Sequence, residues 1–281
     1  MIRILDCTLR DGGYINDWFF SEKDIKKIIS SLIYSKIDIL ELGYLTQNSK
    51  ENSVLFSSIE DFDIFIDKFE IKTDIPILLM VDYGKFDINK LSYSKNISGI
   101  RLAFYKENYK DIFEHIKIIN DLGYKLYLQP MVTNFYSDYE LKDLLEKTSY
   151  YKIDSFYIVD SFGSFFPNDI ENYFNKIDNF LDKKINIGLH SHDNISSSFL
   201  CAEKIINIAK DRKIIIDSTI NGIGRGAGNL STEFISYFLN HSKNHKYNME
   251  PFINESFFEK NYSQKLKYFI SGLNKKHPFD S

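Results

Sequence analysis

The stretch IRILDCTLRDGGYINDW, residues 2–18, places a short apolar run directly before a charged pair and two glycines. Residues 2–6 are predicted to form a buried strand, because apolar and β-branched side chains dominate them. Arg10 and Asp11 follow where that strand has ended, and Gly12 and Gly13 allow the backbone to fold over the strand end. The same order, a short strand followed by a helix, recurs along the chain.

Eight short apolar or aromatic runs are separated by segments with helical periodicity. The expected strands are 2–6, 37–43, 75–81, 98–103, 124–130, 153–160, 185–191 and 214–221. Ser21 and Asp24 form a helix-start pattern, and Gly123 stands where a helix should stop before the fifth strand. Apolar strands that alternate with helices are typical of a parallel sheet covered by helices. No linker interrupts the series, so we expect an α/β fold of the closed (β/α)8 type, a TIM barrel, rather than a doubly wound sheet.

The segment after the eighth unit has a different character. We expect residues 1–245 to form the barrel and residues 246–281 to form a short C-terminal helical extension. The extension contains many aromatic residues, including the run ESFFEKNYSQKLKYFISGL at 255–273. Such a segment is expected to pack on the barrel or on a partner subunit, and we expect a homodimer.

Composition excludes several classes of protein. The 281 residues include 35 basic and 39 acidic side chains, and a net charge of −4 argues against a nucleic-acid partner. The two cysteines, Cys7 and Cys201, form no CxxC pair, which is typical of a reducing compartment and excludes a disulfide scaffold. No apolar run approaches the ~18–20 residues of a membrane span. We therefore expect a cytoplasmic protein without a membrane partner.

TIM barrels place their chemistry at the C-terminal ends of the strands, in the loops that lead into the helices. Arg10 and Asp11 follow the first expected strand and so belong to this catalytic rim. The alternative is a salt bridge at the rim with a turn behind it.

The seventh expected strand carries two histidines in the run INIGLHSHDN, residues 185–194. His190 and His192 are two positions apart, so their imidazoles point to the same side of the strand. Two imidazoles and a carboxylate from across the barrel mouth form an arrangement that binds a divalent cation and leaves coordination sites open. The alternative is two histidines that are hydrogen-bonded within a polar rim.

A glycine-rich loop follows the eighth expected strand, in the run DSTINGIGRGAGNLSTE at 217–233. Its glycines allow the backbone to approach a ligand closely, and loops at this position often hold phosphate or carboxylate groups. It is not a Walker loop, because no GK[ST] follows. Asn229 stands at the entrance to the last helix of the barrel, where its side chain either caps that helix or turns inward.

Four further polar residues are expected at the mouth as substrate-binding residues. Glu41, Arg101 and Gln129 interrupt otherwise apolar strands, and Asp160 ends the sixth expected strand. Glu41 and Arg101 have an alternative role as partners of each other. For Asp217, near the end of the eighth strand, a structural role is considered.

Together, DCTLRDGGY at 6–14, LHSHDN at 189–194 and NGIGRGAGNLSTE at 221–233 resemble the DRE-TIM metallolyases. This superfamily contains 3-hydroxy-3-methylglutaryl-CoA (HMG-CoA) lyase, the isopropylmalate and homocitrate synthases, and the 4-hydroxy-2-oxovalerate aldolases. The resemblance covers roughly residues 2–240, and the three elements occur in the expected order on the expected strands.

The resemblance implies a divalent metal ion as cofactor, with Asp11, His190 and His192 as ligands and Asn229 as a fourth. Arg10 would face the 2-oxo or enolate oxygen of the substrate. Making or breaking a bond next to a carbonyl builds negative charge on oxygen, which a metal and a fixed guanidinium stabilise. Mn²⁺ or Mg²⁺ suits this role, and Zn²⁺ fits the same types of ligand.

The chain departs from the family at Tyr14. In the pyruvate-type aldolases a histidine close after the metal aspartate serves as catalytic base, but here the stretch is DGGYIND. We assign Tyr14 to catalysis beside Arg10. A tyrosine has an unperturbed pKa of about 10, so it needs help from the metal or Arg10 to act as acid or base. Its alternative role is to orient a water molecule.

Three functions compete. A metal-dependent aldolase, a carbon-carbon lyase that joins or cleaves a 2-oxo acid such as pyruvate and an aldehyde, fits the compact length and the TLRDGGY variant. The branch of the 4-hydroxy-2-oxovalerate aldolases is the nearest, although its helical C-terminal domain is longer than the extension here. An acyl-CoA Claisen enzyme of the isopropylmalate synthase or HMG-CoA lyase kind is the alternative, and the loop after the eighth strand lacks the cysteine of such a lyase. A non-catalytic barrel is disfavoured, because nothing would then retain desolvated polar groups.

Overall fold

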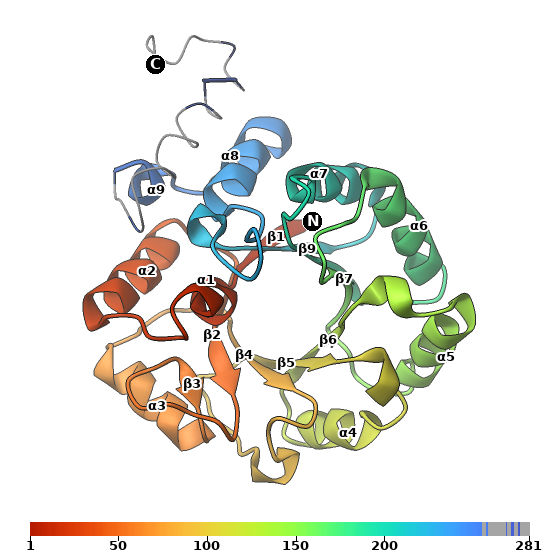
Figure 1. The fold of residues 1–281 in the computed structure, drawn as a ribbon, viewed down its shortest axis with the longest axis horizontal. Coiled ribbons are helices and arrows are strands. Elements are labelled where there is room, and N and C mark those ends of the chain that lie inside the picture. Colours follow the sequence, from red (N-terminus) through yellow and green to blue (C-terminus); the bar gives the residue numbers. More distant parts are fainter. Residues whose placement is uncertain (255–256, 258–267, 269–270, 273–274, 276–281) are drawn as a thin grey trace.

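The computed structural model describes residues 1–254, 257, 268, 271–272 and 275. Eight parallel strands form a closed barrel, and helices surround it (Figure 1). Strand β1 pairs with β9 on one side and with β2 on the other, which closes the sheet. The predicted (β/α)8 TIM barrel is therefore confirmed.

The barrel strands are β1 (Ile2–Asp6), β2 (Ile39–Leu45), β4 (Ile77–Asp82), β5 (Gly99–Phe104), β6 (Lys125–Pro130), β7 (Ser155–Asp160), β8 (Asn186–Ser191) and β9 (Ile214–Ser218). The α-helices are α1 (Thr8–Asp11), α2 (Glu22–Tyr34), α3 (Ile59–Lys68), α4 (Phe113–Asp121), α5 (Asp138–Thr148), α6 (Pro167–Asp178), α7 (Ser198–Ile208), α8 (Thr232–Lys243) and α9 (Glu250–Asn254). Short 3-10 helices lie at Gly12–Ile15 (η1), Ile88–Lys90 (η2), Lys106–Asn108 (η3), Thr133–Phe135 (η4) and Ile220–Gly222 (η5).

The eight predicted strands are all present, and their bounds differ from the expected ones at two informative places. Strand β2 extends to Leu45 because it contains a bulge between Glu41 and Tyr44, where the pairing with β4 shifts. Strand β9 ends at Ser218 and is followed by η5, in which Asn221 adopts a left-handed conformation with φ of 59°. An additional two-residue strand, β3 (Leu55–Phe56), pairs with the end of β2 and was not predicted.

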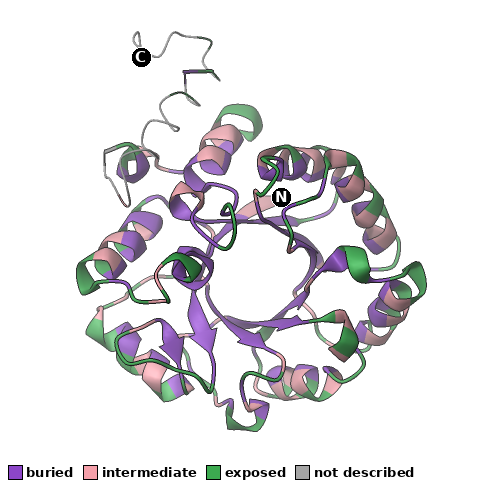
Figure 2. Cartoon of the chain, in the orientation of Figure 1, coloured by how far each residue is buried: buried purple, intermediate pink, exposed green. Residues whose placement is uncertain are grey.

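A capping serine and a glycine mark the ends of two helices. Ser21 caps α2 by accepting a hydrogen bond from the Asp24 backbone, as the sequence predicts. Gly123 lies just beyond the end of α4 with φ of 83°, a conformation that prevents the helix from continuing toward β6. The buried faces of the helices lie against the strands, and the exposed faces point outward (Figure 2).

The interior of the barrel is partly apolar and partly polar. One apolar cluster consists of Leu5, Cys7, Ile39, Leu78, Tyr127, Tyr157, Val159 and Ile215. Further along β2, β5, β6 and β9, the inward side chains become charged or polar. They are Glu41, Arg101, Gln129 and Asp217, and all four are buried. The mouth of the barrel is therefore lined by buried polar groups on an apolar floor.

The C-terminal extension is described in part. Residues 246–254 pack on the barrel, where the Tyr247 hydroxyl donates a hydrogen bond to Asp38 over 2.5 Å and Phe252 is buried. The predicted aromatic helices at 255–273 lie almost entirely outside the described residues. The domain boundary at residue 245 and the homodimer therefore stay predictions. No helix within the described part of the chain is long and apolar enough to cross a membrane.

Candidate active site

Arg10 and Asp11 reach the barrel mouth because helix α1 starts directly after β1. The turn is fixed by Asp6, whose carboxylate accepts a hydrogen bond from the Thr8 backbone over 2.9 Å. Arg10 and Asp11 are each 2% exposed. A terminal nitrogen of Arg10, Nη1, lies 2.5 Å from Asp11 Oδ1, so the rim salt bridge that the sequence offered as an alternative is present.

His190 and His192 project from the end of β8 toward Asp11. The donor atoms of Asp11, His190 and His192 all lie within 4.8 Å of one another, so the three groups could hold a metal ion. His190 binds Asp217 through Nδ1 at 2.9 Å, which leaves its Nε2 atom for a ligand. His192 Nδ1 is buried without a hydrogen-bond partner among the described residues.

The protonation states suit metal binding. Burial would raise the pKa of Asp11, but Arg10 and the two histidines outweigh burial and lower it to about 2. Burial and the neighbouring His190 lower the pKa of His192 to about 4. At neutral pH, Asp11 is therefore an anion and His192 a neutral imidazole, the forms in which these residues ligate metals.

Asn229 turns inward rather than capping α8, whose N-cap residue is Ser231. Its Nδ2 atom donates hydrogen bonds to Asp11 Oδ2 and, over 3.1 Å, to the Ile223 carbonyl. Its Oδ1 atom is buried and has no partner within the described part of the chain. The predicted fourth ligand thus contacts Asp11 through its nitrogen, and its oxygen is unpaired among the described residues.

Glu41, Arg101 and Gln129 form one buried network at the mouth. Glu41 Oε2 lies 2.7 Å from Arg10 Nε, and Glu41 Oε1 lies 3.0 Å from Arg101 Nε. Gln129 accepts a hydrogen bond from Arg101 over 2.8 Å. Arg101 also pairs with Asp217, and it has no exposed surface. The pairing of Glu41 with Arg101 that the sequence allowed is therefore present.

Asp160 has a different environment from the network. Its two carboxylate oxygens accept hydrogen bonds from the backbone of Ser164 and Phe165, each over 2.9 Å. Burial raises the pKa of Asp160, although these backbone donors oppose the effect. Its contacts shape the loop after β7, and its predicted contact with substrate stays a prediction.

Two aromatic residues that the sequence did not point to support Arg10. Trp18 donates a hydrogen bond from Nε1 to the Arg10 carbonyl over 2.7 Å. The Tyr44 ring lies under the Arg10 guanidinium, with 5.8 Å between the ring centre and Cζ. Tyr44 faces inward because of the bulge at Gly43, where a Cβ atom would lie 2.2 Å from the Val54 carbonyl oxygen.

Tyr14 lies at the edge of a cavity of about 190 Å³ beside Arg10. The cavity is lined by Tyr14, Trp18, Tyr44, Leu45, Thr46, Asn48, Lys50, Leu55, Asp82 and Lys85. Tyr14 contacts the Trp18 ring edge-on at 4.7 Å and is 42% exposed. The predicted catalytic tyrosine is thus placed at the entrance to the mouth rather than inside it.

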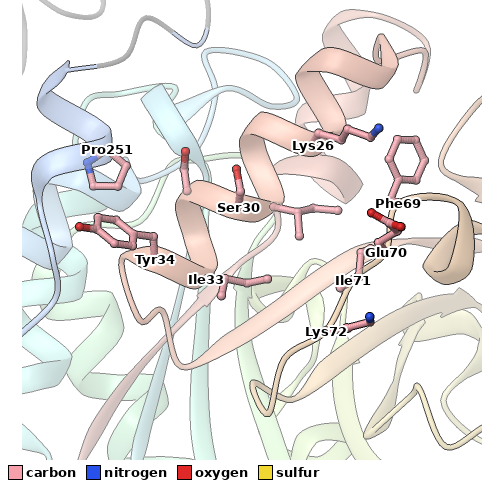
Figure 3. A pocket seen from close by; sticks show the side chains of 11 residues that line it. Lys26, Ser30, Ile33, Tyr34, Phe69, Glu70, Ile71, Lys72 and Pro251 are labelled. Atoms are coloured by element: carbon pink, nitrogen blue, oxygen red, sulfur yellow. The ribbon is translucent and has the colours of Figure 1, made fainter.

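A groove of about 650 Å³ lies outside the barrel between α2, the segment after α3, and Pro251 (Figure 3). Ile71 and Lys72, which line it, precede β4, so the groove is at the end of the barrel opposite to the mouth. It holds none of the predicted site residues.

Glu233 is a buried acid behind the glycine-rich loop. Both of its carboxylate oxygens lie 3.0 Å from the Asn221 backbone nitrogen. Burial raises the pKa of Glu233 from 4.5 to about 7. Since the folded state holds this proton more tightly than the unfolded state, the associated stability is present below pH 4.5 and is lost as pH rises through 7.

Replacing Glu233 with glutamine should therefore stabilise the protein at pH 8.5 by on the order of 2–3 kcal/mol. Glutamine keeps an acceptor for Asn221 and carries no charge. Urea unfolding at pH 5.5 and pH 8.5 measures the effect, which should be small at the lower pH. Equal destabilisation at both values would contradict it. Burial also raises the pKa of Asp6, to about 6, so some pH dependence should remain in the variant.

Known proteins resemble this chain over most of its length. The HMGL-like family model matches residues 101–255. The 4-hydroxy-2-oxovalerate aldolase of Roseiflexus castenholzii is 24% identical over 84% of this chain and 70% of its own length. The corresponding protein of Carboxydothermus hydrogenoformans is 24% identical over 83% of this chain and 69% of its own.

Solved structures show the same architecture. The N-terminal domain of a candidate aldolase from Bacteroides vulgatus superposes with a TM-score of 0.78 at 25% identity, over 99% of this chain and 94% of that one. The HMG-CoA lyase of Brucella melitensis has a TM-score of 0.71 at 10% identity, over 98% and 99%, and supports the fold alone. The chain is therefore an enzyme that belongs to the HMGL-like family, within the DRE-TIM superfamily that its motifs indicated.

Proposed function

We propose that this enzyme is a divalent-metal-dependent aldolase that joins or cleaves the bond between a 2-oxo acid such as pyruvate and an aldehyde. One observation carries the proposal. The metal-ligating atoms of Asp11, His190 and His192 lie within 4.8 Å of one another. Beside them, Arg10 binds Asp11 through Nη1, whereas its Nη2 atom is buried without a partner in the described residues. A buried unpaired guanidinium nitrogen is costly unless a ligand completes it.

The proposed metal ligands are Asp11, His190 and His192, with Asn229 Oδ1 as the fourth. One carboxylate, two imidazoles and an amide oxygen suit Mn²⁺ or Mg²⁺ in an oxygen-binding role and are also acceptable to Zn²⁺. A bound divalent ion would supply positive charge where oxygen becomes negative. A second cluster, Cys7 with His190 and Asp217, is a weaker candidate because the Asp217 carboxylate is already paired with Arg101.

The charge of the network supports a monoanionic substrate. Two arginines, Arg10 and Arg101, meet three carboxylates, those of Asp11, Glu41 and Asp217, so one negative charge is left over. A divalent cation would reverse the sign, and one substrate carboxylate would then bring the site to neutrality. Arg10 Nη2 is the donor that we assign to the oxygen that becomes negative as the enolate forms.

We assign the cavity beside Arg10 to the aldehyde. Aromatic and aliphatic side chains in its lining suit the carbon chain of an acceptor, and Asp82 and Lys85 in the same lining offer polar contacts. Tyr14 stands at the cavity edge, where its hydroxyl is available as an acid or base or to orient water.

The relatives support this class of reaction. Those compared above are named for cleavage of 4-hydroxy-2-oxovalerate. The acyl-CoA alternative has less support, because Cys7 and Cys201 are both buried and neither lies in the glycine-rich loop.

Proton NMR in D₂O tests the proposal. Pyruvate incubated with the protein and Mg²⁺ should lose its methyl signal as enolate forms, and chelation with EDTA should stop the loss. An absence of exchange, with metal binding demonstrated, would contradict the proposal for pyruvate. Acyl-CoA condensations and larger 2-oxo acids would then be measured.

A further inference from the structure

Arg101 lies at the centre of a chain of buried charges that connects two parts of the mouth. Its side chain projects inward from β5 and has no exposed surface. Tyr157 and Gln129 hold it in place. The Tyr157 hydroxyl accepts a hydrogen bond from Nη2 over 3.2 Å, its ring centre lies 4.5 Å from the guanidinium carbon, and Gln129 accepts from Nη1 over 2.8 Å.

One arm of the chain runs from Arg101 to Arg10. Arg101 Nε lies 3.0 Å from Glu41 Oε1, and Glu41 Oε2 lies 2.7 Å from Arg10 Nε. Glu41 is 1% exposed, so water does not compete for either contact. Glu41 thus fixes the guanidinium that we assign to the substrate.

The other arm runs from Arg101 to His190. Arg101 Nη1 bonds Asp217 Oδ2, Arg101 Nη2 donates to Asp217 Oδ1 over 3.1 Å, and Asp217 Oδ2 lies 2.9 Å from His190 Nδ1. This bidentate contact fixes the plane of the carboxylate that orients the imidazole. Asp11 connects the ends of the two arms, because it forms an ion pair with Arg10 and its carboxylate lies near His190.

We infer that Arg101 is a positioning residue that holds Arg10 and His190 in place together, through Glu41 and Asp217 respectively. The inference rests on the proposed function, because it concerns the substrate and metal halves of that site. Arg101 itself pairs with Glu41 and Asp217 rather than with Arg10 or a proposed metal ligand. The guanidinium donates to Asp217 through both Nη atoms and forms an ion pair with Glu41 through Nε at 3.0 Å, whereas the single ammonium group of lysine does not hold two carboxylates in this fixed geometry.

A different role for Arg101 is to neutralise buried carboxylates, with no consequence for geometry. Arg101→Lys separates the two roles, because lysine keeps the charge. We expect this variant to weaken Mn²⁺ binding, measured by electron paramagnetic resonance, by about 10-fold or more, in the range of losses at residues that orient metal ligands. Pyruvate binding in the presence of saturating Mn²⁺, measured by calorimetry, should weaken by a similar factor.

Arg212→Lys is the matched control. Arg212 lies just before β9, away from the mouth, and is also a buried arginine, 1% exposed. It binds the Asp178 carboxylate and backbone carbonyls of residues 178–185. This control should leave both affinities within about 2-fold of wild type, whatever it does to the melting temperature.

Variants at the two carboxylates then test the route. If Arg101 acts on His190 through Asp217, Arg101→Lys should cost less than about 2-fold in Mn²⁺ affinity when Asp217→Asn is already present. If it acts on Arg10 through Glu41, it should likewise cost less than about 2-fold in pyruvate affinity when Glu41→Gln is present. Equal losses in every background would overturn the inference and leave Arg101 with a structural role only.

Tyr157→Phe keeps the test decisive if Arg101→Lys does not fold. This variant removes one hydrogen bond to Arg101 and retains the ring, and both affinities should fall by about 2-fold to 5-fold. Unchanged affinities in a folded Tyr157→Phe protein would contradict the inference. Wild-type protein separates the two proposals. Failure to bind Mn²⁺ would overturn both, whereas Mn²⁺ binding without pyruvate binding would overturn only the proposed substrate.

Discussion

Replacing Asp11 with asparagine is expected to weaken Mn²⁺ binding at least about 100-fold and to abolish exchange of the pyruvate methyl protons. Changes in residues that merely orient a ligand cost about 10–100-fold in metal affinity, so loss of the only charged ligand should cost no less. Asparagine has nearly the same shape. Its amide nitrogen would, however, face either Arg10 Nη1 or Asn229 Nδ2, both of which are donors to Asp11.

The measurement is electron paramagnetic resonance of free Mn²⁺, followed by the NMR exchange assay at saturating metal. Asp17→Asn is the matched control, because Asp17 lies in the same loop and its exposed side chain pairs with Lys50, away from the proposed metal ligands. Thermal unfolding checks that both variants fold. An Asp11→Asn protein that binds Mn²⁺ as tightly as wild type would remove Asp11 from the ligand set, and with it the reason for placing chemistry at this rim.

Several of the site residues that the sequence identified lie on strands, where periodicity alone determines direction. His190 and His192 differ by two positions at the end of β8, so their shared direction follows from the pleat. Arg101 and Gln129 were found for the same reason, since both interrupt apolar strands that have no bulge. The barrel itself was predictable because most of its strands precede a helix with a clear apolar face, although only the short η2 lies between β4 and β5.

Trp18 and Tyr44 were missed for identifiable reasons. Simple alternation from Glu41 would direct residue 43 inward and Tyr44 outward, but the bulge at Gly43 reverses this. Trp18 returns to Arg10 because Asp17 and Trp18 both adopt left-handed conformations, with φ of 57° and 62°. Such backbone choices depend on contacts with the loop after β2, including the bond from the Val54 backbone to the Trp18 carbonyl, which no local pattern encodes.

Asn229 represents an intermediate case. The sequence allowed a helix cap or an inward side chain, and the choice depends on the path of the glycine-rich loop. Gly222 and Gly228 approach so closely that a Cβ atom on Gly228 would lie 2.0 Å from the Gly222 carbonyl oxygen. This tight turn places Asn229 before the helix, next to Asp11, and leaves Ser231 at the cap position.

Replacing Arg10 with lysine is expected to lower the rate of pyruvate exchange at saturating metal by about 100-fold to 1,000-fold, the usual cost of removing a donor from a developing oxyanion. Arg10 performs three tasks at once. Nε binds Glu41, Nη1 binds Asp11, and Nη2 is left for a ligand. The ammonium group of lysine would be held by the two carboxylates, so the position of Nη2 would be empty while the charge is retained.

The lysine variant should affect the rate more than Mn²⁺ affinity, because the ligand Asp11 keeps a cationic neighbour. Arg225→Lys is the matched control in the exposed part of the glycine-rich loop and should exchange at the wild-type rate. An Arg10→Ala variant adds a positive test. Free guanidinium should restore part of its exchange rate if Nη2 acts on the substrate oxygen, since the cavity walls of Trp18 and Tyr44 would still frame the vacated space. Exchange by Arg10→Lys within about 3-fold of wild type would instead mean that the metal ligands alone stabilise the enolate, and that Arg10 serves to hold Asp11.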